Sequence, residues 1–430
     1  MNSIVKPVPC EAPTFGAFDR FLRERLIGQL AALRHGRLLL EDACGTIALG
    51  ETAGHSGLPI HLQILDPAFY RHVAANGSVG AGEAWMDGLW RCDNLVGLMQ
   101  LLVRNRDLLD GMEQGLARLG GIAMRLWFAL RRNTRAGSRR NIAAHYDLGN
   151  EFFGLFLSRN LMYSSANWGD EADTLESAST RMLDLICRKL ALRSADRVIE
   201  IGTGWGGFAI HAARHFGCHV TTTTISREQY RLARKRVEAA GLGDRISVLL
   251  EDYRDLHGQY DKLVSIEMIE AIGAPYLETY FHQLGALVKP GGRALLQAIT
   301  IEDHRYALAL KSVDFIKRHV FPGSFIPSIG ALMDAKTRAC DLSLTHLEDF
   351  GNCYARTLEA WRQRFLAHLP QVAEQGFDER FTRLWEFYLA YCEAGFRERS
   401  IGVAHLLLTK PGMPAASLPP QTGAQHRPFA

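Results

Sequence analysis

Polar side chains follow two neighbouring apolar segments in the middle of the chain. Thr224, Ser226 and Gln229 follow the first segment, and the pair Glu251 and Asp252 follows the second. Hydroxyl and amide groups of the first set could hydrogen-bond a ribose, and an acid of the second set could accept a hydrogen bond from an adenine amine. These residue types predict a site for a nucleoside-like ligand.

Two further polar groups follow later apolar segments. Glu270 comes after the run that ends at residue 266, and Gln297 lies near the end of the run 293–299. A carboxylate there can take up a proton, and an amide can orient a ligand. The alternative for Glu270 is a structural role as an acid at the start of a helix.

A glycine run joins an apolar segment to a helix-like pattern that begins at residue 208. Glycine tolerates positive φ and lets a ligand approach the backbone closely, so this arrangement is typical of nucleotide-like cofactor sites. Glu200, Gly202, Gly204 and Gly206 give the spacing E-x-G-x-G-x-G. This spacing fits an S-adenosylmethionine (AdoMet) site better than the dinucleotide pattern. An ordinary tight turn is the alternative.

Alternating strand and helix patterns must position these residues. The predicted strands are 197–201, 219–224, 246–250, 262–266 and 293–299, and the predicted helices between them are 208–216, 227–240 and 276–288. The alternation predicts a parallel sheet covered on both faces, with ligands at the carboxyl ends of its strands. Later helices are predicted at 305–320, 354–369 and 379–396, and the apolar run 403–408 predicts an antiparallel edge strand.

The first 140 residues predict a small mixed α and β domain without a catalytic constellation. The pattern predicts helices at 18–30, 67–73, 82–90 and 94–119, with strands and turns at 36–64 and a separating glycine run at 77–82. The Pro-, Ala- and Gln-rich end of the chain predicts disorder. The predicted division is therefore 1–140, 141–412 and 413–430.

Composition describes an ordinary globular protein of 430 residues, with 47% hydrophobic and 22% charged residues. The net charge is only +3, so any attraction to an anionic surface must be local. The eight cysteines form no C-x-x-C pair and no zinc spacing, which predicts reduced thiols and no metal site. The sequence has neither a signal-like segment nor an apolar run of membrane-spanning length, which predicts a cytoplasmic location.

One basic stretch, residues 124–140, combines aromatic residues with six arginines. They are Arg125, Arg131, Arg132, Arg135, Arg139 and Arg140. Such a stretch can lie at a membrane interface, where arginines meet lipid phosphates. A solvated interdomain linker is the alternative. Nucleic acid is not predicted as a partner, because no base-reading motif accompanies the arginines.

Mixed aromatic and polar segments flank the predicted sheet on both sides. They span residues 145–153, 163–168, 350–357 and 391–399. Such segments could close over a cofactor, and ordinary packing is the alternative for any one of them.

Seven segments together resemble the cyclopropane-fatty-acyl-phospholipid synthase family, which includes the mycolic acid cyclopropane synthases and related fatty-acid methyltransferases. They are 146–153, 163–168, 198–207, 224–229, 267–273, 354–361 and 392–399. The resemblance implies an α/β fold of the class I AdoMet-dependent methyltransferases: Rossmann-like, mostly parallel, with an antiparallel edge strand and helical additions. Residues 1–140 resemble the family's lipid-recruiting N-terminal domain.

The resemblance also implies an activity. A methyl(ene) group would pass from AdoMet to the cis double bond of unsaturated acyl chains in membrane phospholipids, giving cyclopropane fatty acids through a carbocation. The implied partners are those acyl chains and the bilayer surface, with the protein peripheral to the inner face of the membrane. A homodimer is left open.

Site residues follow from the resemblance position by position. The implied cofactor residues are Tyr163, Ser164, Gly202, Gly204, Thr224, Gln229 and Asp252. A bicarbonate ion, the implied proton acceptor, would be held by Ser165, Glu270, Gln297, the backbone of Ile299, and Tyr354. Cys392 matches the family's active-site cysteine, although methyl transfer to an alkene needs no covalent enzyme intermediate.

Two positions depart from the family. Ser165 stands in place of the usual cysteine, and Gln297 in place of the usual histidine. A serine can still supply a donor, whereas a glutamine is never cationic and removes a charge-assisted bond to an anion, worth about 1.5–3 kcal/mol. The loss raises a branched product as the alternative to ring closure. A catalytically inactive lipid-binding protein is the alternative of another class; the intact glycine run and Glu270 argue against it.

Overall fold

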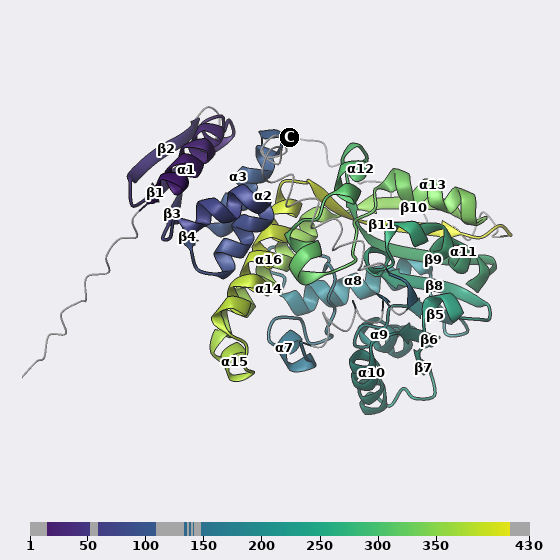
Figure 1. Ribbon diagram of the computed structural model, residues 1–430. Coiled ribbons are helices and arrows are strands. Elements are labelled where there is room, and N and C mark those ends of the chain that lie inside the picture. The colour runs from purple at the N-terminus through teal and green to yellow at the C-terminus, as the bar shows by residue number, and fades with distance from the viewer. Residues whose placement is uncertain are drawn as a thin grey trace, which may run out of the picture. The chain divides into compact units, whose positions relative to one another are not determined.

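The computed structural model describes residues 15–51, 59–108, 133–135, 137–138, 141 and 148–412 (Figure 1). The chain forms two compact units. The first gathers residues up to 130 with 312–320 and 366–398, and the second comprises 131–311, 321–365 and 399 onward. The predicted division followed chain order, whereas these units interleave because two later segments pack with the first. The predicted tail 413–430 lies outside the described residues.

A seven-stranded sheet forms the centre of the second unit. Its strands are β5 (Arg197–Ile201), β6 (His219–Thr224), β7 (Ile246–Leu250), β8 (Tyr260–Ile266), β9 (Val288–Ile301), β10 (Ser343–Asp349) and β11 (Ile401–Thr409). Their order is β10-β11-β9-β8-β5-β6-β7, and the five strands from β9 to β7 are parallel. The mostly parallel α/β fold is confirmed.

The antiparallel strand predicted at 403–408 is present as β11, but it is not at the edge. β10 pairs with β11 in antiparallel fashion and forms the edge of the sheet. Every residue of β10 is exposed, so this strand carries no apolar run that the sequence could reveal.

Helices cover both faces of this sheet. Alternate strand residues face opposite sides, so Val198 and Leu295 belong to one apolar cluster and Ile199 and Leu296 to the other. The first cluster includes residues of α8 (Leu175–Leu190), α9 (Gly207–Phe216) and α10 (Arg227–Ala239). The second includes residues of α11 (Leu277–Leu287) and α13 (Ile329–Ala339). The three layers leave the carboxyl ends of the parallel strands free to carry a site.

The predicted helix 305–320 is wrong as a single element. The chain forms α12 (Asp303–Lys311) and then a π-helical turn (Ile316–Val320). Asp314 causes the interruption, because its carboxylate accepts from the Lys317 N–H at 2.8 Å and starts a new turn. The predicted helix 354–369 divides into α14 (Gly351–Ala367) and α15 (Leu369–Glu374), and α16 (Glu379–Arg397) agrees with its prediction.

The first unit contains a four-stranded sheet of order β2-β1-β3-β4. Its elements are α1 (Ala17–Leu30), β1 (Gly36–Asp42), β2 (Gly45–Glu51), β3 (Ile60–Ile64), α2 (Ala68–Met86), β4 (Trp90–Cys92) and α3 (Leu95–Arg104). The two helices predicted at 67–73 and 82–90 correspond to the two parts of α2, which a kink at Gly77 separates, with φ 55° and ψ −129°. The rest of the predicted separating run, 78–82, is helical, and the second part ends at Met86.

Helix α16 completes this unit by packing on α2 and α3. The Trp85 indole N–H donates to the Arg383 carbonyl at 2.9 Å, and Arg104 pairs with Glu398 at 2.6 Å. Among the described residues, no helix combines the length and the apolar character needed to cross a bilayer.

Candidate functional site

The glycine run forms the turn between β5 and α9. Gly202, Gly204 and Gly206 all have positive φ, at 100°, 51° and 82°, which a side chain would disfavour. A Cβ added at Gly204 would meet no atom within 4 Å of the described chain, so this glycine faces open space. The backbone is therefore bare where a ligand would approach it.

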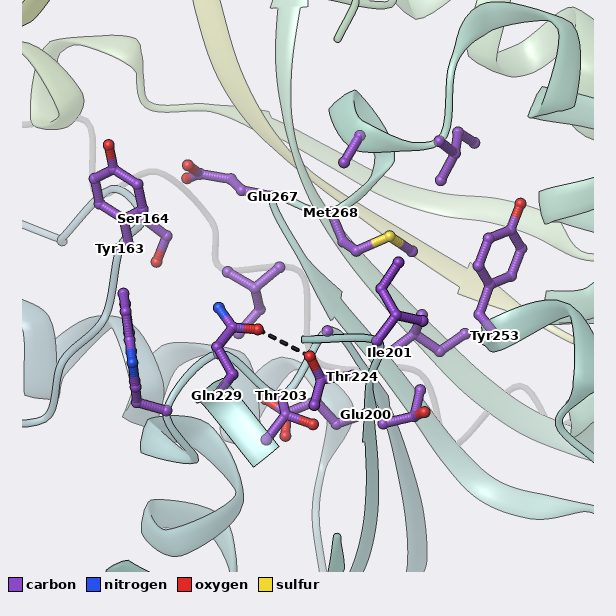
Figure 2. Close-up of a pocket in the computed structure, with 18 of the residues that line it drawn as sticks. Tyr163, Ser164, Glu200, Ile201, Thr203, Thr224, Gln229, Tyr253, Glu267 and Met268 are labelled. Carbon is purple, nitrogen blue, oxygen red and sulfur yellow. Dashed lines mark hydrogen bonds between the residues drawn. The ribbon is translucent and has the colours of Figure 1, made fainter. Parts of the chain in front are cut away.

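A pocket of about 1090 Å³, its open mouth included, lies at this turn, and we call it the cofactor pocket. Figure 2 shows its lining side chains coming from several segments around the strand ends. The predicted cofactor residues that line it are Tyr163, Ser164, Glu200, Gly202, Gly204, Thr224, Gln229, Glu251 and Asp252. Gly206 and Ser226 do not line it; they cap α9 and α10.

Three buried polar atoms of the lining have no hydrogen-bond partner among the described residues: Ser164 Oγ, Glu200 Oε2 and the Tyr253 hydroxyl. Burial raises the pKa of Glu200 to about 8. Buried polar atoms without partners are costly, so a pocket that holds three of them fits a polar ligand such as AdoMet.

Two polar residues that line the cofactor pocket, Thr224 and Asp252, already have partners within the protein. The Thr224 hydroxyl donates to Gln229 Oε1 at 2.9 Å, as the dashed line in Figure 2 shows. Asp252 pairs with Arg254 at 2.7 Å, so its carboxylate is partly engaged inside the protein. A ligand amine would share Asp252 with the guanidinium of Arg254.

A second group of polar residues surrounds Glu267, which also lines the cofactor pocket. The Ser165 N–H and the Gln297 amide donate to Glu267 Oε1 at 2.9 and 2.8 Å, and the Tyr354 hydroxyl donates to Oε2 at 2.7 Å. Burial raises the pKa of Glu267 to about 7, although these three donors act in the opposite direction. Figure 2 shows the carboxylate pointing toward the segment of Tyr163 and Ser164.

Glu270 lies beside Glu267 in a short 3-10 turn, Ile269–Ala271. Its Oε1 accepts from the Ile299 N–H at 2.6 Å, and its buried Oε2 has no partner among the described residues. Burial, and next the charge of Glu267, raise the pKa of Glu270 to about 8. We call the two acids and the groups that donate to them the carboxylate cluster.

Strand register and one unusual backbone angle bring the carboxylate cluster together. Ile266, the last residue of β8, is the register partner of Gln297 on β9. Glu267 then adopts φ 47°, rare for a residue other than glycine, and its N–H donates to the Gln297 carbonyl at 2.7 Å. Tyr354 comes from the first turn of α14 and Ser165 from the segment before α8. Sequence patterns do not reveal such an angle.

Aromatic rings lie against both parts of the site. Tyr163 has its ring centroid 5.3 Å from that of Trp361 and 6.4 Å from that of Phe321. Trp361 also contacts Tyr354, with 6.0 Å between ring centroids. Aromatic faces of this kind can stabilise a positive charge through their quadrupoles.

Cys392 lies on α16 in the first compact unit, whereas the other predicted catalytic residues all lie in the second. Burial raises the pKa of its thiol strongly, which disfavours the thiolate that a nucleophile requires.

The basic stretch 124–140 falls largely outside the described residues. Of its six arginines the structure describes Arg135, which pairs with Asp255 at 2.7 Å. Residues 145–147 of the upstream aromatic segment are also outside the described residues. No group of three His, Cys, Asp or Glu side chains placed to hold a metal is found in the described part of the chain.

Sequence reasoning missed two residues of the site, Glu267 and His405. Glu267 begins the segment 267–273, one of those that resemble the family, and its place directly after a strand was the available signal. His405 lies inside the apolar run 401–409, where its Nε2 is 2.9 Å from Gln297 Oε1. A polar residue in an otherwise apolar strand was the signal there, because a buried imidazole requires partners.

Comparison with known proteins adds to this geometry. The model of the mycolic acid cyclopropane synthetase family matches residues 133–406. A tuberculostearic acid methyltransferase of Mycobacterium tuberculosis is 37% identical over 400 residues, 91% of this chain and 92% of its own. The cyclopropane-fatty-acyl-phospholipid synthase of Escherichia coli is 36% identical over 355 residues, 82% of this chain and 88% of its own.

Two solved structures of cyclopropane synthases are also similar to this chain. A mycolic acid cyclopropane synthase solved in complex with S-adenosylhomocysteine is 27% identical, with a TM-score of 0.59. The match covers 63% of this chain and 98% of that protein. A cyclopropane synthase from Mycobacterium tuberculosis gives the same identity, TM-score and coverage.

Proposed function

The chain belongs to the mycolic acid cyclopropane synthetase family, and from this premise we propose that it transfers a methyl(ene) group from AdoMet to the cis double bond of unsaturated phospholipid acyl chains. The proposed product is a cyclopropane fatty acid. The single observation that carries the proposal is Glu267: a partly buried acid, with its pKa raised to about 7, that borders the cofactor pocket. A proton acceptor poised near neutral pH is what ring closure requires.

In this proposal, residues of the cofactor pocket bind AdoMet and residues of the carboxylate cluster transfer the proton. AdoMet, when bound, supplies an electrophilic methyl group on a sulfonium. Ser164, Glu200 and Tyr253 offer the unpartnered polar atoms that would hold it. Methyl addition to the alkene leaves a positive charge on the acyl chain, next to the aromatic rings of Tyr163 and Trp361. A proton must then leave the new methyl group so that the ring closes.

Glu267 is our candidate for the group that accepts this proton. Ser165, Gln297 and Tyr354 donate to its two oxygens and hold the carboxylate in one orientation. Burial, and next the charge of Glu267, raise the pKa of Glu270, which favours a neutral Glu270 beside an ionised Glu267.

The bicarbonate ion that the resemblance implies would compete for the same donors. Four donors assigned to it already donate to carboxylates: Ser165, Gln297 and Tyr354 to Glu267, and Ile299 to Glu270. Among the groups that the resemblance assigns to the ion, Glu270 retains an oxygen, Oε2, without a hydrogen-bond partner in the described chain. Turnover that rises with added bicarbonate in CO₂-depleted buffer would favour the ion over Glu267 as proton acceptor; turnover independent of bicarbonate would favour Glu267.

The test of the proposed function uses purified protein, AdoMet and two kinds of phospholipid vesicle. Vesicles with cis-unsaturated chains should yield lipids heavier by one methylene unit in mass spectrometry, and vesicles with saturated chains should not. If neither lipid gains mass although calorimetry shows AdoMet binding, the proposed acceptor is wrong. If AdoMet does not bind, the chain is an inactive member of the family.

A methyl- or methylene-branched chain is the second candidate product. The observation that favours it is Gln297, an uncharged donor where the family usually has histidine. If proton removal from the methyl group is slow, a hydride shift on the acyl chain precedes it and no ring forms. NMR of the product lipid separates the two, because cyclopropane protons resonate at high field and a branched chain has none there.

The proposed partner is the surface of an anionic bilayer, with the protein peripheral to the inner face of the membrane. On α1 the Phe18 and Phe21 side chains are 59% and 54% exposed, and Arg20 and Arg25 are exposed on the same helix. Exposed aromatic residues beside arginines suit the boundary between headgroups and acyl chains. The basic stretch 124–140 remains a second candidate contact.

Co-sedimentation with anionic vesicles tests this surface. Replacement of both Phe18 and Phe21 by Ser should reduce the bound fraction, and replacement of Leu344 and Leu347 by Ser serves as control. Those leucines are 36% and 40% exposed on β10. Equal binding by both double variants would count against α1, and binding unchanged between low and high salt would count against the arginines.

A further inference from the structure

A chain of hydrogen bonds runs from Gln297 away from the carboxylate cluster. His405 Nε2 lies 2.9 Å from Gln297 Oε1, and His405 Nδ1 lies 2.8 Å from Lys189 Nζ. Lys189 also pairs with Glu348, whose side chain is 47% exposed. The chain thus connects Gln297, which donates to Glu267, with a residue at the protein surface, and we call it the relay.

Elements of the second unit fix the members of the relay. Gln297 on β9 and His405 on β11 are register partners, so their side chains lie on the same face of the sheet. They are 1% and 0% exposed. Lys189 comes from α8 and Glu348 from β10. The ring of Phe350 lies 4.7 Å from the imidazole and covers it.

The contacts determine where the protons are. A lysine ammonium can only donate, so His405 Nδ1 must accept from Lys189. The neutral imidazole then carries its proton on Nε2 and donates to Gln297 Oε1. Because its oxygen is occupied in this way, Gln297 presents its amide N–H to Glu267 Oε1 at 2.8 Å.

We propose that His405 is a positioning residue for the methyl transfer reaction: it holds the Gln297 amide in the orientation that donates to Glu267. The inference rests on the proposed function of the site. Without His405 the amide could rotate by half a turn and place its oxygen against the Glu267 carboxylate. Two acceptors facing each other would disfavour the ionised form of Glu267.

The charges around His405 support a neutral ring. Burial, and next the charges of Lys189 on α8 and His346 on β10, lower the pKa of His405 well below its usual value. Glu348 on β10 pairs with Lys189, and its carboxylate lies 3.6 Å from His346 Nε2. Gln297 thus occupies the position where the family usually has a histidine. A histidine, His405, lies instead on the next strand, β11, further from Glu267.

The alternative is that His405 only fills space in the core. An apolar ring of similar size would then be tolerated without any effect on the chemistry. His211 provides a matched control, because it is a buried histidine of α9 in the same unit, and its imidazole lies 2.9 Å from the Asp184 carboxylate of α8. Neither residue is a member of the relay.

The experiment compares His405→Phe, His405→Gln and His211→Phe in turnover, AdoMet affinity and the pH dependence of turnover. His405→Phe should lower turnover roughly tenfold to hundredfold, since it leaves a buried amide oxygen unpaired. It should also move the rise of turnover to higher pH while AdoMet affinity changes less than about twofold. His405→Gln, which keeps an N–H donor, should restore part of the loss. Equal pH profiles for His405→Phe and His211→Phe would overturn the proposal.

A second pair of variants keeps the proposal testable if His405→Phe does not fold. Lys189 is 12% exposed and lies between His405 and the surface residue Glu348, where a substitution disturbs the core less. Lys189→Met should shift the pH profile in the same direction by a smaller amount, and Lys189→Arg should keep the wild-type profile. Identical profiles for these two variants would also overturn the proposal.

One readout does not depend on turnover. Nitrogen-15 NMR of the imidazole should show the Nε2–H tautomer of His405 in the protein with AdoMet and without lipid. The Nδ1–H tautomer would overturn the relay. If the wild-type chain forms no methylated lipid, the proposed function fails, and the tautomer then decides the relay by itself.

Discussion

The cofactor pocket takes much of its lining from short stretches of chain, whereas the carboxylate cluster joins groups that lie far apart in sequence. Three glycines and Glu200 stand within seven residues of one strand and turn. Glu267, by contrast, meets Ser165, Gln297 and Tyr354, which are 102, 30 and 87 residues away. Local backbone shape therefore creates the first region, and tertiary packing creates the second.

Glu200 of the first region and Glu267 of the second also differ in their hydrogen bonds. Glu200 leaves one oxygen without a partner among the described residues, while both oxygens of Glu267 accept hydrogen bonds. An acid that lacks partners favours a ligand, and an acid that is fully oriented favours chemistry at a fixed position. Variants of the two regions should separate AdoMet affinity from turnover.

The largest effect is expected for Glu267→Gln. The change removes the proposed proton acceptor and keeps the size of the side chain, so turnover should fall by about 10³-fold. AdoMet affinity should stay within about threefold, as calorimetry would show. Glu278→Gln, at an exposed ion pair with Arg338, is the control and should be neutral. A Glu267→Gln variant with more than a tenth of wild-type turnover would place the proton acceptor elsewhere.

Gly204→Ala should produce the reverse pattern. The new methyl group would project into the open space of the cofactor pocket and weaken AdoMet binding by more than tenfold, which is above about 1.4 kcal/mol. Gly241→Ala is matched to it: Gly241 has φ 68° and likewise has no atom of the described chain within 4 Å of an added Cβ, but it lies outside the pocket. The same AdoMet affinity in both variants would show that backbone strain alone is at work.

Tyr354→Phe tests how the donors tune Glu267. The Tyr354 hydroxyl lowers the pKa of Glu267, so its removal should raise that pKa above the present value of about 7. The reaction needs ionised Glu267, so turnover at pH 7 should fall roughly tenfold and recover at pH 9. The measurement is the pH dependence of turnover at saturating AdoMet. A midpoint that does not move would mean that Glu267 is not the group that titrates.

The smallest effect is expected in stability. The pKa of folded Glu200 is raised to about 8, above its ordinary value, so the folded state binds more protons between about pH 4.5 and pH 8. The stability that this proton uptake contributes is lost as pH rises through 8. The free energy of unfolding of Glu200→Gln, measured in urea relative to wild type, should therefore increase by on the order of 1 kcal/mol when the pH is raised from 5.5 to 8.5. A constant difference would show that Glu200 does not titrate in this range.

Sequence predicted the parts of the molecule that depend on local pattern. Strand and helix alternation gave the five parallel strands, and the glycine spacing gave the turn at Gly202 and Gly204. The pattern gave no sign of β10, because its residues are all exposed and an edge strand needs only a neighbour's backbone. Glu267 was missed as a site residue because its orientation follows from φ 47°, which no residue type announces.

The place of α16 has a consequence for how the chain reaches its native state. Helices α2 and α3, made early during synthesis, pack against α16, which ends 293 residues after Arg104. The first unit therefore cannot be completed on the ribosome until almost the whole chain has emerged, unlike a domain that folds as soon as it is made. A fragment of residues 1–140 would expose the apolar faces that α16 covers, and we expect it to aggregate rather than fold. Chaperone dependence during expression would follow from the same delay.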